Sequence, residues 1–215
     1  MSYYGLQVPK TQQPSKSLYT LYYPHTTDIK KRCWESDLIQ FISIDPAIKN
    51  LAIRVEQRTG DNVVCLYSGK FSPWEMKTID HAEANNMYNN INDILNNLHE
   101  YYASTHYVLI EKQLPTNYQA TRVAQHILSY FLLTLKDLPL LPSIIELDAK
   151  VKGKMLGAPK CNKNELKKWA VEKATELSLK RNDEYTLSLL KKNKKKDDLA
   201  DVVCQIEGFC IMMNI

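Results

Sequence analysis

The chain has 215 residues, a net charge of only +4 and a 44% share of hydrophobic residues. This composition is typical of one globular domain whose core is large enough to fold without disulfide bonds. No run of 18 apolar residues occurs, and no apolar segment follows the N-terminus, so we expect neither a membrane span nor a signal peptide.

Residues 1–37 differ in composition from the rest of the chain. They are rich in Tyr, Thr, Ser and Pro and have no sustained hydrophobic period. This pattern predicts an N-terminal arm that is extended or partly disordered, followed by a folded domain over residues 38–215. Acidic residues at Asp28, Glu35 and Asp37 argue against a transit peptide.

The first part of the predicted domain consists of strands. The segments LIQFISID (38–45), LAIRVEQR (51–58) and NVVCLYSGKF (62–71) are apolar runs separated by short turns. They predict three strands joined by hairpins. Apolar residues three and four apart then predict a helix over 79–104, and YVLIEKQ (107–113) predicts a buried strand.

The second part alternates helices with a strand. A helix is predicted over 119–136, then the strand SIIELDA (143–149), and then helices over 163–179 and 198–213. The lysine-rich segments before and between the last two helices have no clear period. The order of elements predicts an α/β fold with a five-stranded mixed sheet flanked by helices.

Basic residues are concentrated late in the chain. Residues 149–196 contain 15 Lys and Arg against 5 Asp and Glu, whereas the whole chain has 28 basic and 24 acidic residues. A basic segment in an otherwise acidic protein indicates a polyanionic partner, and the simpler alternative is a solvated lysine-rich surface.

Four carboxylates are expected to meet at one edge of the sheet. Asp45 ends the first predicted strand and Glu111 lies near the end of the fourth, and a helical crossover between these strands allows them to be neighbours. Asp198 and Asp201 are three residues apart at the start of the last helix, so they share a face of it. That helix has an apolar stripe that must pack on the sheet (Leu199, Val202, Val203, Ile206, Phe209 and Cys210).

Each acid has an ordinary structural alternative. An Asp after a strand often forms a turn, and Asp198 or its neighbour Asp197 could cap the last helix. Four carboxylates in one place repel one another unless a positive charge lies among them. A hard divalent cation such as Mg²⁺ or Mn²⁺ suits such a set, and two such ions can promote hydrolysis of a phosphodiester.

The sequence resembles the RuvC-type Holliday junction resolvases. FISIDPAIKN and VLIEKQ are similar to the family's two strand motifs, DLAD to its closing pair of acids, and VKGKMLGAPKCNK to its segment after the fifth strand. The combination is most similar to the resolvases of poxviruses and related large DNA viruses, and it covers residues 38–215. Ala47 departs from the pattern, since many members have glycine after the proline.

The resemblance implies an RNase H-like fold, a homodimer, and Mg²⁺-dependent resolution of four-way (Holliday) DNA junctions by paired symmetric nicks. It implies that Asp45, Glu111, Asp198 and Asp201 are catalytic metal ligands, with two Mg²⁺ ions at the site and Mn²⁺ as a substitute. It implies an intracellular location, in the host cytoplasm if the protein is viral, and a role in recombination or in processing viral replication intermediates.

Several basic residues are candidates for contacts with branched DNA. Lys163 matches a family lysine near the scissile phosphate, with Lys152 a weaker candidate for that role and Lys167 a rival if the register differs. The predicted DNA contacts are Lys112, Gln113, Lys150, Lys152, Lys154, Lys160 and Lys167.

Three other functions deserve comparison with a junction resolvase. An RNase H-like or branched-DNA nuclease of different specificity would keep the fold and change the substrate. An actin-like ATPase needs glycine-rich phosphate loops and two domains, which a chain with 6 glycines does not provide. A junction-binding protein without catalysis would not need all four acids.

Overall fold

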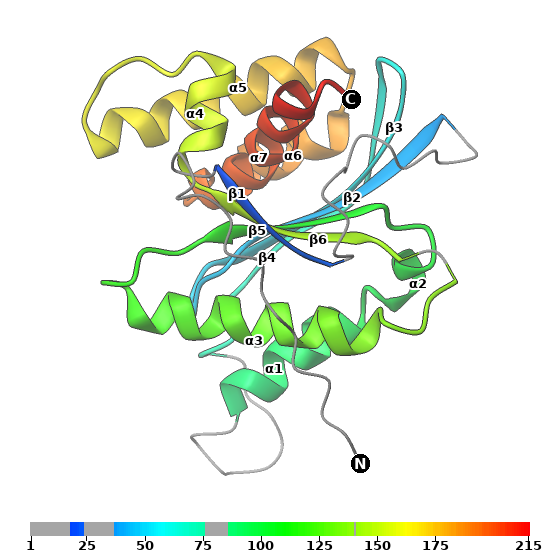
Figure 1. Ribbon diagram of the computed structural model, residues 1–215. Helices are drawn as coiled ribbons and strands as arrows, with labels where there is room; N and C mark the ends of the chain where they lie inside the picture. The colour runs from blue at the N-terminus through cyan, green and yellow to red at the C-terminus, as the bar shows by residue number, and fades with distance from the viewer. Residues whose placement is uncertain (1–17, 24–36, 76–85, 140) are drawn as a thin grey trace, which may run out of the picture.

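A computed structural model of the chain describes residues 18–23, 37–75, 86–139 and 141–215. In these residues a central sheet lies between two layers of helices (Figure 1). The sheet has six strands in the order β1-β6-β5-β2-β3-β4. Their bounds are β1 (Tyr19–Tyr23), β2 (Leu38–Asp45), β3 (Leu51–Thr59), β4 (Asn62–Phe71), β5 (Tyr107–Lys112) and β6 (Ser143–Asp148).

The strand pairing confirms the predicted mixed sheet. β2, β3 and β4 form consecutive antiparallel hairpins, whereas β2, β5 and β6 run parallel to one another. The parallel strands are linked by helical crossovers, which brings the carboxyl ends of β2 and β5 to the same edge.

The prediction of five strands was wrong, because β1 adds a sixth. This strand lies in the segment predicted to be an arm, and it pairs antiparallel with β6 at the edge of the sheet. The Tyr22 hydroxyl also donates a hydrogen bond to Glu146 Oε2 at 3.2 Å. A short edge strand is held by backbone pairing, so its sequence carries no strong period. Residues 1–17 and 24–36 lie outside the described part, and the domain boundary near residue 37 stays a prediction.

Seven helices occur in the described residues. They are α1 (Asn86–Asn96), α2 (His99–Tyr102), α3 (Tyr118–Thr134), α4 (Lys150–Leu156), α5 (Lys163–Lys180), α6 (Glu184–Lys192) and α7 (Asp197–Met213). The helix predicted over 79–104 corresponds to α1 and α2, and its first residues lie outside the described part. None of the described helices is long and apolar enough to cross a membrane.

Helices α4 and α6 were missed in segments that the sequence left without structure. α4 buries only Val151 and stops at Gly157, whose φ of +74° ends the helix. α6 begins where the Asp183 side chain accepts a hydrogen bond from Thr186 N at 2.9 Å, and it buries only Thr186 and Leu190. One or two buried positions are too few to produce a detectable helical period.

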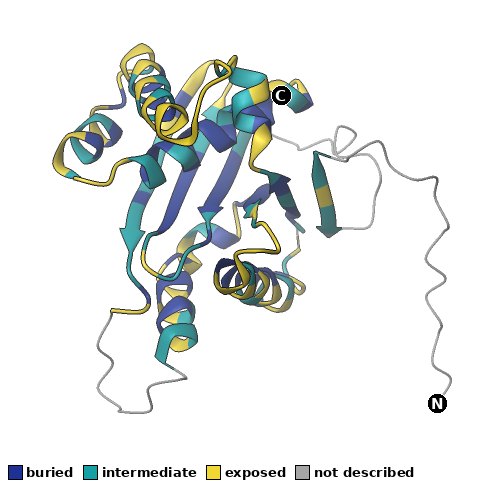
Figure 2. Ribbon diagram, turned by 90° about the vertical axis from the view of Figure 1, so that its left-hand side faces the viewer, coloured by how far each residue is buried: buried dark blue, intermediate teal, exposed yellow. Residues whose placement is uncertain are grey.

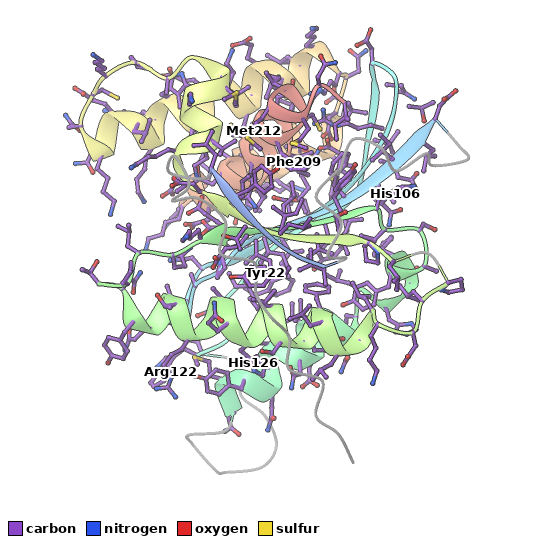
Figure 3. The ribbon with its side chains drawn as sticks, viewed as in Figure 1. Tyr22, His106, Arg122, His126, Phe209 and Met212 are labelled. Atoms are coloured by element: carbon purple, nitrogen blue, oxygen red, sulfur yellow. The ribbon has the colours of Figure 1, made fainter. Side chains whose placement is uncertain are left out.

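Helices cover both faces of the sheet. α1 and α3 pack on one face against residues such as Ile42 and Ile44, while α7 and α4 pack on the other against Phe41 and Leu109. Figure 3 shows Phe209 and Met212 of α7 on one side of the sheet and His126 of α3 on the other. All six residues of the predicted α7 stripe are buried, and Figure 2 shows buried residues along the strands and the inner helix faces.

Candidate active site

Asp45 and Glu111 lie side by side at the edge of the sheet. Ile44 of β2 is opposite Ile110 of β5 in the parallel ladder, so the next residue on each strand is one of the two acids. Side chains alternate between the faces of a sheet, and Phe41, Tyr107 and Leu109, which lie an even number of positions before these acids, pack with α7. Both carboxylates therefore point toward the layer that contains α7.

Helix α7 brings the other two acids to the same edge. Asp198 and Asp201 lie in its first turns, and both act electrostatically on Asp45. Gln205 anchors the helix, because its buried side-chain amide donates to Leu109 O at 3.1 Å and to Ile44 O at 3.5 Å. Gln205 was not among the predicted site residues, although a glutamine inside an otherwise apolar stripe is a signal that a buried polar partner exists.

Lys152 of α4 occupies the middle of these carboxylates. Its ammonium nitrogen lies 2.6 Å from Glu111 Oε2 and 2.8 Å from Asp201 Oδ1. The sequence analysis predicted Lys152 as a DNA contact and only as a weaker candidate for the active-site lysine. In the structure Lys152 joins Glu111 to Asp201. We call the four acids the acidic cluster (Asp45, Glu111, Asp198 and Asp201).

A glycine on α7 allows Lys152 to reach that position. A Cβ atom at Gly208 would lie 3.0 Å from the Lys152 Cα and 3.3 Å from its nitrogen. These distances are shorter than ordinary contacts and involve backbone atoms, so a side chain at this position would push α4 away from α7. Gly208 was not singled out from the sequence, because nothing in its neighbours indicates which backbone approaches it.

The charges of the acidic cluster influence one another strongly. Burial raises the pKa of Asp45 well above its usual range, and Glu111, Asp201 and Asp198 raise it further, while Lys152 lowers it. Burial lowers the pKa of Lys152, but Glu111, Asp201 and Asp45 outweigh burial and raise it. Lys152 by itself therefore does not balance the carboxylates around it, and the cluster attracts further positive charge.

The first turn of α7 is held by two more lysines. Lys167 of α5 forms an ion pair with Asp197, and Lys70 of β4 lies 3.9 Å from Asp198 Oδ2. The residue before the helix is Lys196, and no side chain caps the helix there, so neither Asp197 nor Asp198 serves as the N-cap. Burial, then Asp197, raises the pKa of Asp198, whose Oδ2 is buried without a hydrogen bond.

These residues fit a divalent metal in their chemistry. Four carboxylates from β2, β5 and α7 provide the hard oxygen ligands that Mg²⁺ and Mn²⁺ prefer. As they stand, the described residues include no group of three Asp, Glu, His or Cys side chains arranged to hold an ion. Lys152 already provides a positive charge between Glu111 and Asp201.

The other predicted residues lie around the cluster rather than in it. Lys163, predicted beside the scissile phosphate, is exposed at the start of α5 and has no ion pair with a described residue. Lys167 is paired with Asp197, and the half-buried Gln113 donates to Glu111 O at 3.4 Å. The remaining predicted contacts are exposed on β5, on α4 and before α5 (Lys112, Lys150, Lys154 and Lys160).

Sequence comparison finds relatives in iridescent viruses, and no protein-family model matches the chain. The uncharacterized protein 97L of Invertebrate iridescent virus 3 is 34% identical over 102 residues, which are 47% of this chain and 46% of that protein. The uncharacterized protein 170L of Invertebrate iridescent virus 6 is 31% identical over 122 residues, or 48% of this chain and 50% of that protein. The chain thus matches about half the length of these relatives.

Comparison of structures finds the same fold in Holliday junction resolvases. The yeast mitochondrial resolvase Ydc2 has a TM-score of 0.51 at 16% identity, covering 82% of this chain and 81% of that one. RuvC of Thermus thermophilus has a TM-score of 0.51 at 14% identity, covering 81% of this chain and 96% of that one. The fold of this chain is similar to that of RuvC-type resolvases. RuvC bound to a Holliday junction gives a TM-score of 0.50 at 15% identity.

Proposed function

We propose that this chain is a metal-dependent endonuclease that resolves four-way DNA junctions by paired symmetric nicks. The observation that carries the proposal is the acidic cluster, where four carboxylates from β2, β5 and α7 gather at the carboxyl edge of the sheet and Lys152 pairs with two of them. Ligands of open α/β sheets gather at this edge. The similarity in fold to junction resolvases supports the choice of substrate.

The proposed catalytic roles follow from the positions of the side chains. The four carboxylates would hold two Mg²⁺ ions, with Mn²⁺ as a substitute. Such ions activate a water molecule and stabilise the leaving oxygen of a phosphodiester. Lys152 is within reach of Glu111 and Asp201, so we assign its ammonium group to a phosphate oxygen whose negative charge grows during cleavage. Lys163 stays a candidate for a second contact with the phosphate.

The remaining parts of the proposal concern DNA, assembly and location. Exposed lysines on α4 and in the segment before α5, with Lys112 and Gln113 after Glu111, would contact the backbone of the junction. Two coordinated nicks need two active sites, so we propose a homodimer. The relatives in iridescent viruses support a viral origin, and we propose on that basis an intracellular role in recombination or in the processing of viral replication intermediates.

A cleavage assay tests this function. Purified protein with Mg²⁺ is incubated with a labelled four-way junction, a linear duplex and an RNA–DNA hybrid, each in parallel with the variant Asp201→Asn. We expect symmetric nicks in the junction alone, and their loss in the variant. Cutting of the hybrid or of plain duplex would replace the proposed substrate with that of another RNase H-like nuclease. Tight junction binding without cutting in Mg²⁺ or Mn²⁺ would contradict catalysis.

A further inference from the structure

A hollow lined by lysines lies directly beside the acidic cluster. Its volume is about 590 Å³, and its lining includes Lys167 and Lys168 of α5 and the segment Lys194–Lys196 before α7. We propose that this hollow binds backbone phosphates of the DNA arm that flanks the cut strand. The inference rests on the proposed function for the identity of the DNA, and it assigns phosphate contacts to four lysines that were not among the predicted DNA contacts (Lys168, Lys194, Lys195 and Lys196).

Four of the five ammonium groups that line the hollow have no partner among the described residues. Lys168, Lys194, Lys195 and Lys196 are exposed, and none of their side chains forms an ion pair or hydrogen bond with a described residue. Other lysines of the same region are paired, since Lys167 contacts Asp197 and Lys173 lies 2.8 Å from Glu176. The carboxylates of Glu172, Asp197 and Asp198 also line the hollow, so five lysines face three acids, and this net positive charge favours a polyanionic ligand.

The backbone of the lysine segment is fixed, although its side chains are free. Lys70 of β4 donates its ammonium hydrogen to Lys195 O at 2.6 Å. Asn193 donates from its side chain to Leu189 O at 2.9 Å, and Ala200 N donates to Lys196 O at 3.0 Å. A ligand that binds here does not have to order the backbone, so less of the binding free energy is lost to entropy.

The hollow and the acidic cluster share a residue. Asp198 lines the hollow, and its carboxylate also acts electrostatically on Asp45. Consecutive phosphates of one DNA strand follow at about 3.4 Å along the helix axis. A strand with one phosphate at the carboxylates therefore places neighbouring phosphates at the lysines, where they offset the repulsion between DNA and the acids.

The experiment compares two variants that remove equal charge. Lys194→Gln/Lys195→Gln removes two ammonium groups at the hollow, and Lys191→Gln/Lys192→Gln removes two exposed ones at the end of α6 that do not line it. Junction binding is measured by fluorescence anisotropy with EDTA, to prevent cutting, over a series of KCl concentrations. Melting temperatures of both variants verify that they fold.

We expect the slope of log Kd against log salt to be smaller by about 2 in Lys194→Gln/Lys195→Gln, the hollow variant, than in the wild type. Each lost phosphate contact contributes about 0.9 to this slope. The affinity of the hollow variant at about 0.1 M KCl should fall roughly tenfold or more, with a change below about twofold for the control variant. Equal losses in both variants would show a general effect of net charge. An unchanged slope in the hollow variant would show that these lysines are only solvated, and either result would overturn the proposal.

A second experiment determines which phosphates of the DNA contact the hollow. Junctions with methylphosphonates in place of the phosphates next to the cut should bind the wild type more weakly but cause no further loss in Lys194→Gln/Lys195→Gln. Additive losses would contradict a contact at those phosphates. Measurements on unbranched duplex separate this inference from the proposed function. A wild type that neither prefers nor cuts junctions would refute that function, while the slopes of the two variants on duplex would still decide whether the hollow binds phosphates.

Discussion

Two clusters of charged residues lie under α7 on the same face of the sheet, and they differ in their balance of charge. The first, which we call the arginine network, joins three carboxylates to three guanidinium groups from β3, the turn between α5 and α6, and α7. Its members are Arg54, Glu56, Arg58, Arg181, Asp183 and Glu207. The second is the acidic cluster, in which four carboxylates have two ammonium groups near them, Lys152 beside Glu111 and Asp201 and Lys70 at 3.9 Å from Asp198.

The two clusters shift the pKa of a buried carboxylate in opposite directions, because one surrounds it with cations and the other with anions. Burial acts to raise the pKa of Glu56, but Arg54, Arg58 and Arg181 outweigh it and lower that pKa. Burial raises the pKa of Asp45 and the neighbouring carboxylates add to the rise. The arginine network is thus a structural set of ion pairs, whereas the acidic cluster has an excess of negative charge that stability does not require. This contrast is a physical argument for function at the second cluster.

The largest expected effect separates function from stability at Asp45. Asp45→Asn should reduce junction cleavage at least about a thousandfold, or about 4 kcal/mol of activation free energy, because it removes a metal ligand. The same change removes repulsion, so thermal unfolding should show equal or greater stability. Asp45 has a higher pKa in the folded protein than in the unfolded chain, so its ionisation destabilises the folded wild type. The stability gained by Asp45→Asn should therefore grow as pH rises above about 4, the pKa of Asp in an unfolded chain. A large loss of stability would make Asp45 a structural residue.

The next effect belongs to the arginine network. Glu56→Gln leaves the guanidinium groups of Arg54 and Arg58 without their shared carboxylate, which lies 2.6 Å from Arg54 Nε and 2.7 Å from Arg58 Nε. Breaking a buried pair in this way costs about 3 kcal/mol or more. Urea unfolding of the variant and the wild type measures the difference in their free energies of unfolding. A loss no greater than that caused by Asp45→Asn would abolish the distinction between the clusters.

Gly208 links the packing of α7 to the acidic cluster. Gly208→Ala should cost about 2 kcal/mol, because the new Cβ meets the α4 backbone at Lys152. It should also reduce cleavage, since α4 moves and carries Lys152 with it. Gly153→Ala is a matched control on α4, where the new Cβ meets only Ala158 Cβ at 3.3 Å. Equal activity of the two variants would argue against a precise position for Lys152.

The smallest expected effect concerns the ammonium group itself. Lys152→Met leaves the carboxylates without their internal cation, so Mg²⁺ should bind about tenfold more tightly, or about 1.4 kcal/mol, when measured by calorimetry. The arginine network serves as the control, because Arg181→Met should not change the affinity for Mg²⁺. Weaker binding of Mg²⁺ to Lys152→Met would show that Lys152 organises the ligands instead of balancing their charge.

The elements that sequence predicts well are those with long apolar patterns. Buried apolar residues predict β2 and β5, which carry Asp45 and Glu111, and the apolar stripe predicts the packing of α7. These three elements bring the acids together. The features that sequence missed depend on contacts between distant segments. β1 is held by its pairing with β6, α4 by its approach to Gly208, and Lys152 reaches Glu111 only because α4 packs on α7.

A crystal structure of the protein soaked in Mn²⁺ tests the account most directly, because anomalous scattering identifies the ion. We predict Mn²⁺ between Asp45, Glu111 and the aspartates of α7, with the Lys152 ammonium withdrawn from at least one carboxylate. The arginine network should contain no ion in the same crystal. An acidic cluster without Mn²⁺, and with Lys152 still bound to Glu111 and Asp201, would contradict the assignment of a metal site.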